Sequence, residues 1–268
     1  GMSGRPVLVF DGKSTLLASP PNPTIDASAS EIMTALIPGF GVNGALASSA
    51  RWAVFVACRP EPAAAGSTLL SQKFVDASSN QFTRAICSNM STAGAFSSGT
   101  LAVVDRDTTT TRYHVATPSG SKWSLISWVS NPQTTGSAYE VYYNGEEMDN
   151  STAAHTGTAA ASDSPFPTRI GQTSFFPASN FSPFDSFWSG EVGLIVAIQR
   201  SGTDVITTAE RQLVEGAIAW YYGEQAKLPT SHPYYSTPPP PADGTVAAFQ
   251  RARLALSPFG TVTVRDGE

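Results

Sequence analysis

The segment from Ser174 to Trp188 has the residue types that bind neutral sugars. Aromatic rings stand in it among serine, asparagine and proline, at Phe175, Phe176, Phe181, Phe184, Phe187 and Trp188. An exposed ring can stack on the apolar face of a sugar while amide and carboxylate oxygens accept its hydroxyl groups. The pattern therefore predicts a carbohydrate-binding site formed by Phe175, Phe176, Gln172, Asn180 and Asp185.

The same rings also have a structural interpretation, in which the segment folds over one end of the protein and fills its core. Phe187 and Trp188 adjoin an apolar strand, so we expect these two rings to be buried. For Phe175 and Phe176 both interpretations stay open. These two rings can fill the core, but loops seldom expose so much ring surface without a use, which favours a binding role.

The spacing of the histidine and cysteine residues does not indicate a metal site. His114, His155 and His232 are scattered, and no cysteine pair has the spacing of a zinc site. Calcium needs no such motif, because loop carboxylates and carbonyls can bind it, so Asp163 and Asp185 are candidate calcium ligands. We expect no other cofactor.

One glycine-rich segment, Gly39 to Gly44, matches the dinucleotide-binding fingerprint Gly-x-Gly-x-x-Gly. The fingerprint requires a crossover helix that presents its amino end to the pyrophosphate. Only Ala45 to Ala50 separates the last glycine from the next strand, which is too short for that helix. We interpret the segment as a glycine-rich loop.

The composition excludes several classes of partner. Charged residues make up 14% of the chain, and the net charge is −5 without a cluster of lysine or arginine, which argues against nucleic-acid binding. No apolar stretch approaches 18 residues and no leader pattern is present, so we expect neither a membrane span nor a signal peptide. Cys58 and Cys87 both lie in strand-like segments, where we expect buried thiols more than a disulfide.

Two strands that are apolar on both faces form the centre of the predicted fold. Alternation along Glu191 to Ile198 places Val192, Leu194, Val196 and Ile198 on one face, with Gly193, Ile195 and Ala197 on the other. Arg51 to Cys58 has the same character. Strands of this kind are covered on both sides.

Shorter strands separated by turn residues surround these two. We predict them at Ser67 to Phe74, Gln81 to Cys87, Leu101 to Asp105, Thr111 to Thr117, Trp123 to Val129, Tyr139 to Tyr143 and Arg169 to Gly171, with a first strand at Pro6 to Phe10. Asn144-Gly145 predicts a type I′ hairpin turn, because both central residues of that turn need positive φ. Turn-linked strands in a doubly covered sheet favour an all-β sandwich of two antiparallel sheets.

One helix is predicted, from Thr208 to Tyr222, packed at an edge or end of the sandwich. It begins with a capping box at Thr207 and Glu210 and ends at Gly223. Its apolar stripe comprises Leu213, Val214, Ala217, Ile218 and Tyr221.

A polyproline run, Pro238 to Pro241, divides the chain into a domain at residues 1–236 and a linker with a short tail at residues 237–268. Arg253 to Leu256 and Thr261 to Val264 can pair as a small hairpin, which is marginally stable alone and would have to dock on this domain or on a second chain. A homo-oligomer formed through this tail is one expectation.

Pieces of this pattern, in their order along the chain, resemble the concanavalin A-like lectin/glucanase superfamily in its laminin-G-like branch. The pieces are Leu8-Val9-Phe10-Asp11-Gly12, Trp123, Tyr142-Tyr143-Asn144-Gly145, Arg169-Ile170-Gly171 and the block from Gly190 to Trp220. The ending Leu228-Pro229 with His232-Pro233-Tyr234 resembles domains of bacterial and phage structural proteins. The resemblance spans residues 5–236 and implies a two-sheet jelly roll, often a carbohydrate-binding or adhesive module.

Some members of this superfamily are glycosidases, whose catalytic strand carries two carboxylates in the pattern Glu-x-Asp-x-x-Glu. The segment that matches this pattern best is Glu147-Met148-Asp149, but Thr152 occupies the position of the second glutamate. We interpret this segment as the solvated flank of a turn and expect no catalytic residues.

The sequence thus favours a non-catalytic carbohydrate-binding or adhesive module whose partner is a glycan or host-surface receptor. Its expected location is a virion or a cell surface. Two alternatives remain: a structural virion or tail protein that makes only protein contacts, and a glycoside hydrolase or lyase of the glucanase branch.

Overall fold

The computed structural model describes residues 5, 7–11, 15–17, 32–34, 51–60, 67–75, 81–88, 101–106, 111–116, 122–130, 139–148, 169–171, 188–200 and 205–240. Its strands are β1 (Leu8–Asp11), β2 (Thr15–Leu17), β3 (Ile32–Thr34), β4 (Arg51–Pro60), β5 (Ser67–Val75), β6 (Gln81–Ser88), β7 (Leu101–Arg106), β8 (Thr111–Ala116), β9 (Ser124–Ser130), β10 (Tyr139–Tyr143), β11 (Glu146–Glu147), β12 (Arg169–Ile170) and β13 (Ser189–Arg200). Its helices are α1 (Thr208–Tyr222) and the short 3₁₀ helix η2 (Gln225–Lys227).

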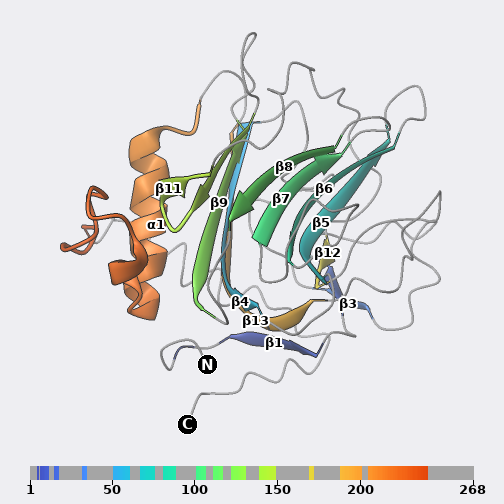
Figure 1. The fold of residues 1–268 in the computed structure, drawn as a ribbon, viewed down its shortest axis with the longest axis horizontal. Coiled ribbons are helices and arrows are strands. Elements are labelled where there is room, and N and C mark those ends of the chain that lie inside the picture. The colour runs from blue at the N-terminus through green and yellow to red at the C-terminus, as the bar shows by residue number, and fades with distance from the viewer. Residues whose placement is uncertain are drawn as a thin grey trace.

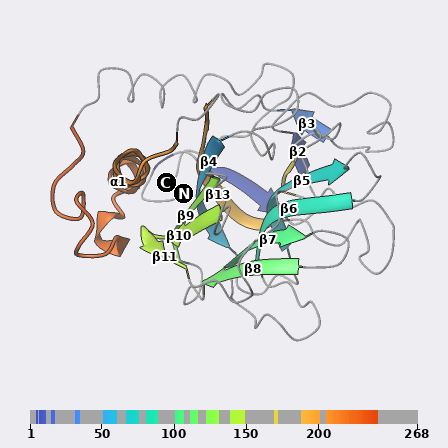
Figure 2. The same ribbon diagram turned by 90° about the horizontal axis from the view of Figure 1, so that it is seen from above.

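These strands form two sheets that face each other (Figures 1 and 2). One sheet has six strands in the order β1-β13-β4-β9-β10-β11, and the other has seven in the order β3-β2-β12-β5-β6-β7-β8. Apolar side chains of both sheets share one core, among them Trp52 and Trp128 from the first and Leu70 and Ile86 from the second. The predicted all-β sandwich of two sheets with one C-terminal helix is therefore confirmed.

The N-terminal strands differ from the prediction in one respect. No strand is predicted at residues 15–17 or 32–34, yet these residues form β2 and β3, which pair in parallel. The remaining strand pairs of the described residues are antiparallel, as predicted. A strand of three residues is too short to show alternation, so periodicity could not reveal it.

Helix α1 lies on the outer face of the six-stranded sheet and not at an edge or end (Figure 2). A second apolar cluster forms there from Ala53, Phe55 and Leu125 of the sheet together with Val214 and Ile218 of the helix. The central strands therefore carry apolar residues on both faces because one face meets the other sheet and the opposite face meets α1. The molecule has three layers, with the six-stranded sheet in the middle.

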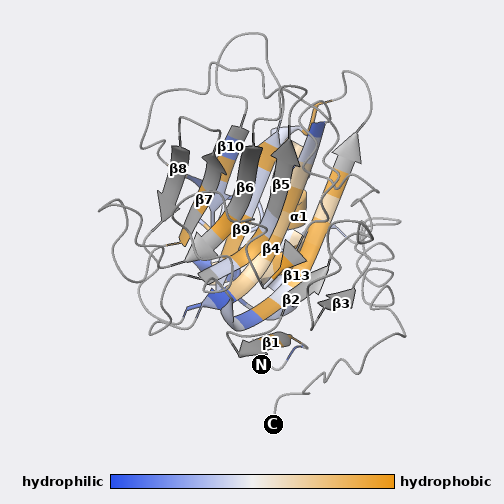
Figure 3. Cartoon of the chain, turned by 90° about the vertical axis from the view of Figure 1, so that its right-hand side faces the viewer, coloured by the Kyte–Doolittle hydropathy of each residue, from blue (hydrophilic) through white to orange (hydrophobic). Residues whose placement is uncertain are grey.

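Strand β13 contains an irregularity that changes which of its residues share a face. Val192 pairs with Cys58 and Ile195 with Val56, so three steps along β13 match two along β4. This extra residue is a β-bulge, which reverses the alternation at that point. Val192 therefore lies in the core between the sheets with Ile195, while Leu194, Val196 and Ile198 pack on the helix side. The predicted grouping of Val192 with these last three residues was wrong. Figure 3 shows the hydrophobic character of β4 and β13.

Helix α1 begins and ends where the sequence predicts. The face that it buries, however, is rotated around the helix axis relative to the predicted apolar stripe. Thr207 Oγ1 accepts from the Glu210 amide, Glu210 accepts from the Thr207 amide, and Gly223 has a φ of 71°. The buried residues, however, are Arg211, Val214, Glu215, Gly216, Ile218, Ala219 and Tyr222. Leu213, Ala217 and Tyr221 are only half-buried. The rotation places an arginine and a glutamate inside, where each neutralises the other.

The hairpin turn at Asn144-Gly145 is confirmed. Asn144 and Gly145 have φ values of 51° and 83°, the positive values that a type I′ turn needs. Asn144 also fastens the turn to β9, because its amide donates to the Leu125 carbonyl and its Oδ1 accepts from the Leu125 amide, both at 2.8 Å. The turn thereby holds β10 and β11 in a fixed position beside β9.

Cys58 is a free, fully buried thiol, as expected, so no disulfide joins it to Cys87. Burial raises the pKa of the Cys58 thiol far above its ordinary value, which leaves it protonated and unreactive at neutral pH.

The chain after α1 folds back against the helix. Leu228 and His232 are buried, Tyr234 and Tyr235 are half-buried, and Ser236, Thr237 and Pro238 are exposed. We call residues 228–235 the C-terminal clasp. Gly216 is needed beneath it, because a Cβ at that position would lie 2.6 Å from the Tyr234 ring.

Truncation after Pro238 is expected to change the melting temperature by no more than about 2 °C, since the last buried clasp residue is His232. Truncation after Lys227 should lower it markedly, because that chain loses buried Leu228 and His232. Thermal unfolding of both chains measures the difference. A chain ending at Pro238 that failed to fold would contradict the domain boundary.

Candidate functional site

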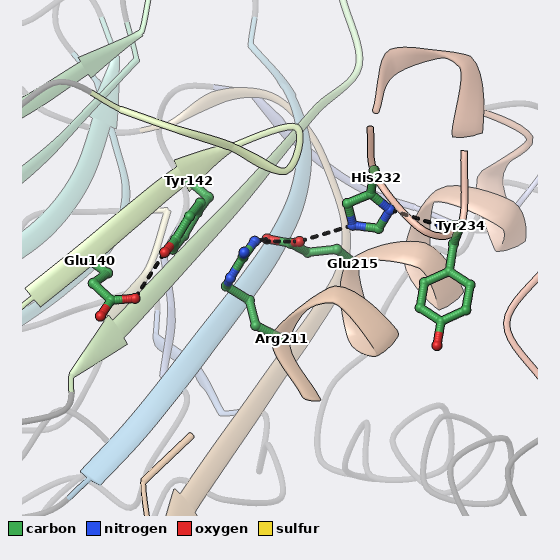
Figure 4. Close-up of polar contacts among 6 residues, drawn as sticks. All are labelled: Glu140, Tyr142, Arg211, Glu215, His232 and Tyr234. Atoms are coloured by element: carbon green, nitrogen blue, oxygen red, sulfur yellow. Dashed lines mark hydrogen bonds and ion pairs between the residues drawn. The ribbon is translucent and has the colours of Figure 1, made fainter. Parts of the chain in front are cut away.

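The most unusual chemistry in the described residues is a group of charged and polar side chains buried between α1, the β10–β11 hairpin and the clasp (Figure 4). It consists of Arg211 and Glu215 from α1, His232 from the clasp and Tyr142 from β10. We call these four residues the buried polar cluster. Burying charge is costly unless the charges are paired and hydrogen-bonded, so each contact in the cluster matters.

Arg211 and Glu215 lie one helical turn apart and form the centre of the cluster. Arg211 Nη1 donates to both carboxylate oxygens of Glu215, at 2.8 and 2.6 Å. The side chains are 7% and 0% exposed, so water hardly screens this ion pair. The Arg211 guanidinium carbon also lies 3.5 Å from the centroid of the Tyr142 ring, which adds a cation–π contact to the hairpin.

His232 joins the clasp to the same carboxylate. Its Nε2 lies 3.2 Å from Glu215 Oε2, and its Nδ1 accepts from the Tyr234 amide at 3.2 Å. Because Nδ1 acts as an acceptor, the ring proton belongs on Nε2, which donates to Glu215. Glu215 therefore accepts from both a helix residue and a clasp residue. Trp220 Nε1 adds a bond to the Tyr234 carbonyl at 2.8 Å.

Tyr142 completes the cluster on the hairpin side. Its hydroxyl donates to Glu140 Oε2 at 2.8 Å. Burial raises the pKa of Tyr142 well above its ordinary value, and the hydrogen bond to Glu140 raises it further. The phenol therefore remains a neutral donor whose ring faces Arg211.

The geometry of the cluster suits a structural role and not catalysis. The Glu215 and His232 side chains are 0% and 1% exposed, so no substrate can reach the atoms that would transfer a proton. What the cluster does is connect three segments that are distant in sequence. Arg211 and Glu215 fix the helix to the hairpin through Tyr142 and to the clasp through His232.

The predicted sugar-binding residues Phe175, Phe176, Gln172, Asn180 and Asp185 lie outside the described residues, as does the candidate calcium ligand Asp163. Trp188 is described, and its complete burial confirms the expectation for that ring. Phe187 lies outside the described residues.

Gly171 and Trp188, the described residues on either side of positions 172–187, lie next to each other. The Gly171 amide donates to the Leu69 carbonyl at 2.7 Å, and the Trp188 amide donates to the Gly171 carbonyl at 2.8 Å. The chain therefore occupies neighbouring backbone positions just before and just after residues 172–187, and we call this hydrogen-bonded pair the closed stem.

Glu147 is exposed on β11 directly after the hairpin turn, as a solvated turn flank requires. Met148 beside it is buried in the core between the sheets, so for that residue the interpretation was wrong. Asp149 and Thr152 lie outside the described residues. Within the part of the chain that the structure describes, no three His, Cys, Asp or Glu side chains gather as a metal site. No helix there has the length and apolar character to span a membrane.

Sequence reasoning missed the buried polar cluster, although one signal for it exists. Arg211 and Glu215 are spaced i, i+4 and fall on the same helical face as Val214, Ile218 and Tyr222. A charged pair inside an apolar stripe indicates a buried ion pair that needs further partners. His232 carries no such signal, because it lies 17 residues from Glu215 in a proline-rich segment.

The sequence matches no protein-family model. It also matches no curated protein. Partial structural similarity exists to a heptameric SAP-like pentraxin from Limulus polyphemus, with 18% identity, 62% of this chain and 69% of that chain covered, and a TM-score of 0.41. A Ruminococcus gnavus IT-sialidase CBM40 bound to α2,3-sialyllactose shows 14% identity, coverage of 60% and 80%, and a TM-score of 0.40.

Domains LG4-5 of the mouse laminin α1 chain show 15% identity, coverage of 55% of this chain and 35% of that chain, and a TM-score of 0.38. All three similarities are partial and concern the fold alone. This chain's own two facing sheets, mostly antiparallel and accompanied by one helix, form a β-sandwich, the fold class that the sequence resemblance implies.

Proposed function

We propose that this protein is a non-catalytic carbohydrate-binding or adhesive module that binds a glycan through the segment between Gly171 and Trp188. The observation that supports the proposal is the closed stem of that segment. Its two ends are joined by the Trp188–Gly171 hydrogen bond and anchored by the buried Trp188 ring. An aromatic-rich loop on a rigid stem is a common way to present binding residues from a β-sandwich.

The composition of the loop gives the chemistry of recognition. Phe175 and Phe176 offer ring faces on which the apolar side of a sugar can stack, while Gln172, Asn180 and Asp185 offer groups for its hydroxyls. A surface poor in charge and rich in neutral polar residues fits an uncharged polyhydroxylated ligand. A phage or bacterial surface structure is the setting we propose for such a module.

Binding without hydrolysis is part of the proposal. A glycosidase needs a raised-pKa carboxylic acid and a second carboxylate across the scissile bond. Glu147 lies on a short exposed strand, and Thr152 occupies the position of the second glutamate. Hydrolysis of a glucan by the purified protein, lost on changing any one carboxylate, would contradict this part of the proposal.

The double variant Phe175→Ala/Phe176→Ala is expected to lose glycan binding while its melting temperature stays within about 2 °C of the wild type, because removing an exposed ring opens no core cavity. A glycan array identifies the ligand, and titration with that ligand measures the loss. The matched control is Trp188→Ala, another ring deletion at the same segment. That change empties a fully buried site and should cost about 3–5 kcal/mol of unfolding free energy.

The outcomes separate the two interpretations of the loop. A double variant that destabilises the protein as strongly as Trp188→Ala would show that Phe175 and Phe176 belong to the core. A stable double variant with wild-type glycan affinity would place the binding site elsewhere.

A further inference from the structure

Strand β1 is the edge of the six-stranded sheet, and it exposes an apolar residue at its centre. Among the described strands, β1 pairs with β13 alone, through Leu8–Val192, Val9–Glu191, Phe10–Gly190 and Asp11–Ser189. Figure 1 shows β1 at the rim of the sheet, beside β13. Val9 is 62% exposed, and among the described residues Val205 is the other large apolar residue on the surface.

An edge strand of this kind is a template for pairing with another strand, because one row of its backbone groups has no partner within the sheet. Proteins usually guard such edges with lysine, proline or a bulge. The sequence Leu8-Val9-Phe10-Asp11 has no lysine or proline and pairs with β13 without a register shift, so its guards are its short length and the charge of Asp11 at its end. The exposed Val9 on this edge therefore favours association.

The strand is complementary to itself when two copies run antiparallel with a two-fold axis at Val9. In that register Val9 lies opposite Val9 of the second copy, and Leu8 lies opposite Phe10. Asp11 then lies opposite Val7, which carries no charge. Arg5, which precedes the strand, is held within its own copy, because its Nε donates to the Tyr221 carbonyl at 3.0 Å and its guanidinium lies over the Tyr221 ring. The next residues in the row of Val9 are Glu191 and Arg59, which form a salt bridge and so add no net charge.

We propose that β1 pairs with β1 of a second copy of this chain, in antiparallel register about Val9, and joins two six-stranded sheets into one continuous sheet. A two-fold axis uses the same strand on both copies, which gives a closed dimer and no filament. This dimer is independent of the proposed glycan site and of the tail after Pro238.

The first test compares molar masses by light scattering over a concentration series, against the 28.1 kDa of one chain. Val9→Lys places like charges opposite each other at the axis and should raise the dimer dissociation constant about tenfold or more. Val205→Lys makes the same change at the other exposed valine and should leave it unchanged. The full chain and the chain ending at Pro238 should dimerise equally.

The second test traps the register. Opposite residues of an antiparallel pair have Cα atoms about 4.5–5.5 Å apart, within the range that a disulfide spans. Val9→Cys should therefore form a disulfide-linked dimer on mild oxidation, and Val205→Cys should not. A wild type that stays monomeric up to millimolar concentration, or a dimer that Val9→Lys does not weaken and Val9→Cys does not trap, would overturn the proposal.

Discussion

A protein with Glu215 replaced by glutamine is expected to melt roughly 10 °C below the wild type. Glutamine has nearly the same size, so the change opens no cavity and removes only the negative charge. Arg211 then remains 94% buried without its counter-ion, and His232 and Arg211 compete for one amide oxygen. Breaking a buried ion pair on one side typically costs about 3–5 kcal/mol, because the remaining charge is uncompensated.

The same substitution five residues earlier in α1 is the matched control. Glu210 closes the capping box with Thr207, and glutamine can take that role. Glu210→Gln should therefore change the unfolding free energy by less than about 0.5 kcal/mol. Thermal melts compare the two variants, and limited proteolysis after Lys227 shows whether the clasp has loosened. Equal melting temperatures for Glu215→Gln and Glu210→Gln would contradict a supporting role for the cluster.

The strands and the hairpin could be predicted because their signals are local. β4 carries apolar residues on both faces, which already requires a layer on each side of the sheet. Asn144-Gly145 specifies its turn by backbone sterics alone. The capping box of α1 is equally local, since its two residues lie three positions apart.

What could not be predicted depends on contacts between distant segments. The bulge in β13 is set by the register against β4; Gly193 is a local signal for it, because an isolated glycine inside a strand often marks a bulge, but the alternation alone did not show it. The sequence showed that α1 needs a sheet, but its position over the outer face depends on which strands are central. The rotation of its buried face depends on His232, which joins the helix only after the clasp has folded back.

The proposed sugar site illustrates the same division. Its residue types are readable in the sequence, and its stem depends on a contact between Gly171, which follows β12, and Trp188, which precedes β13, that no local pattern contains. Gly171 must receive the Trp188 amide for the loop to close. Composition therefore suggests the chemistry of the loop, while the sandwich determines where its two ends are held.

Ile218→Asp is expected to destabilise the protein by about 4 kcal/mol or more, because it places an unpaired carboxylate between α1 and the six-stranded sheet. Ile218 is fully buried among Phe55, Leu125 and Val214 in the cluster on that face. Leu213→Asp is the matched comparison on the same helix. The sequence pattern assigns both residues to one buried stripe, whereas the structure leaves Leu213 half-buried.

The two variants therefore test the rotation of the helix as well as its packing. Denaturant unfolding should show that Leu213→Asp costs less than half as much as Ile218→Asp, since a half-buried carboxylate can turn toward water. Equal and large losses would support the face predicted from periodicity. An unchanged unfolding midpoint for Ile218→Asp would mean that α1 does not cover the sheet, and the three-layer arrangement would then be wrong.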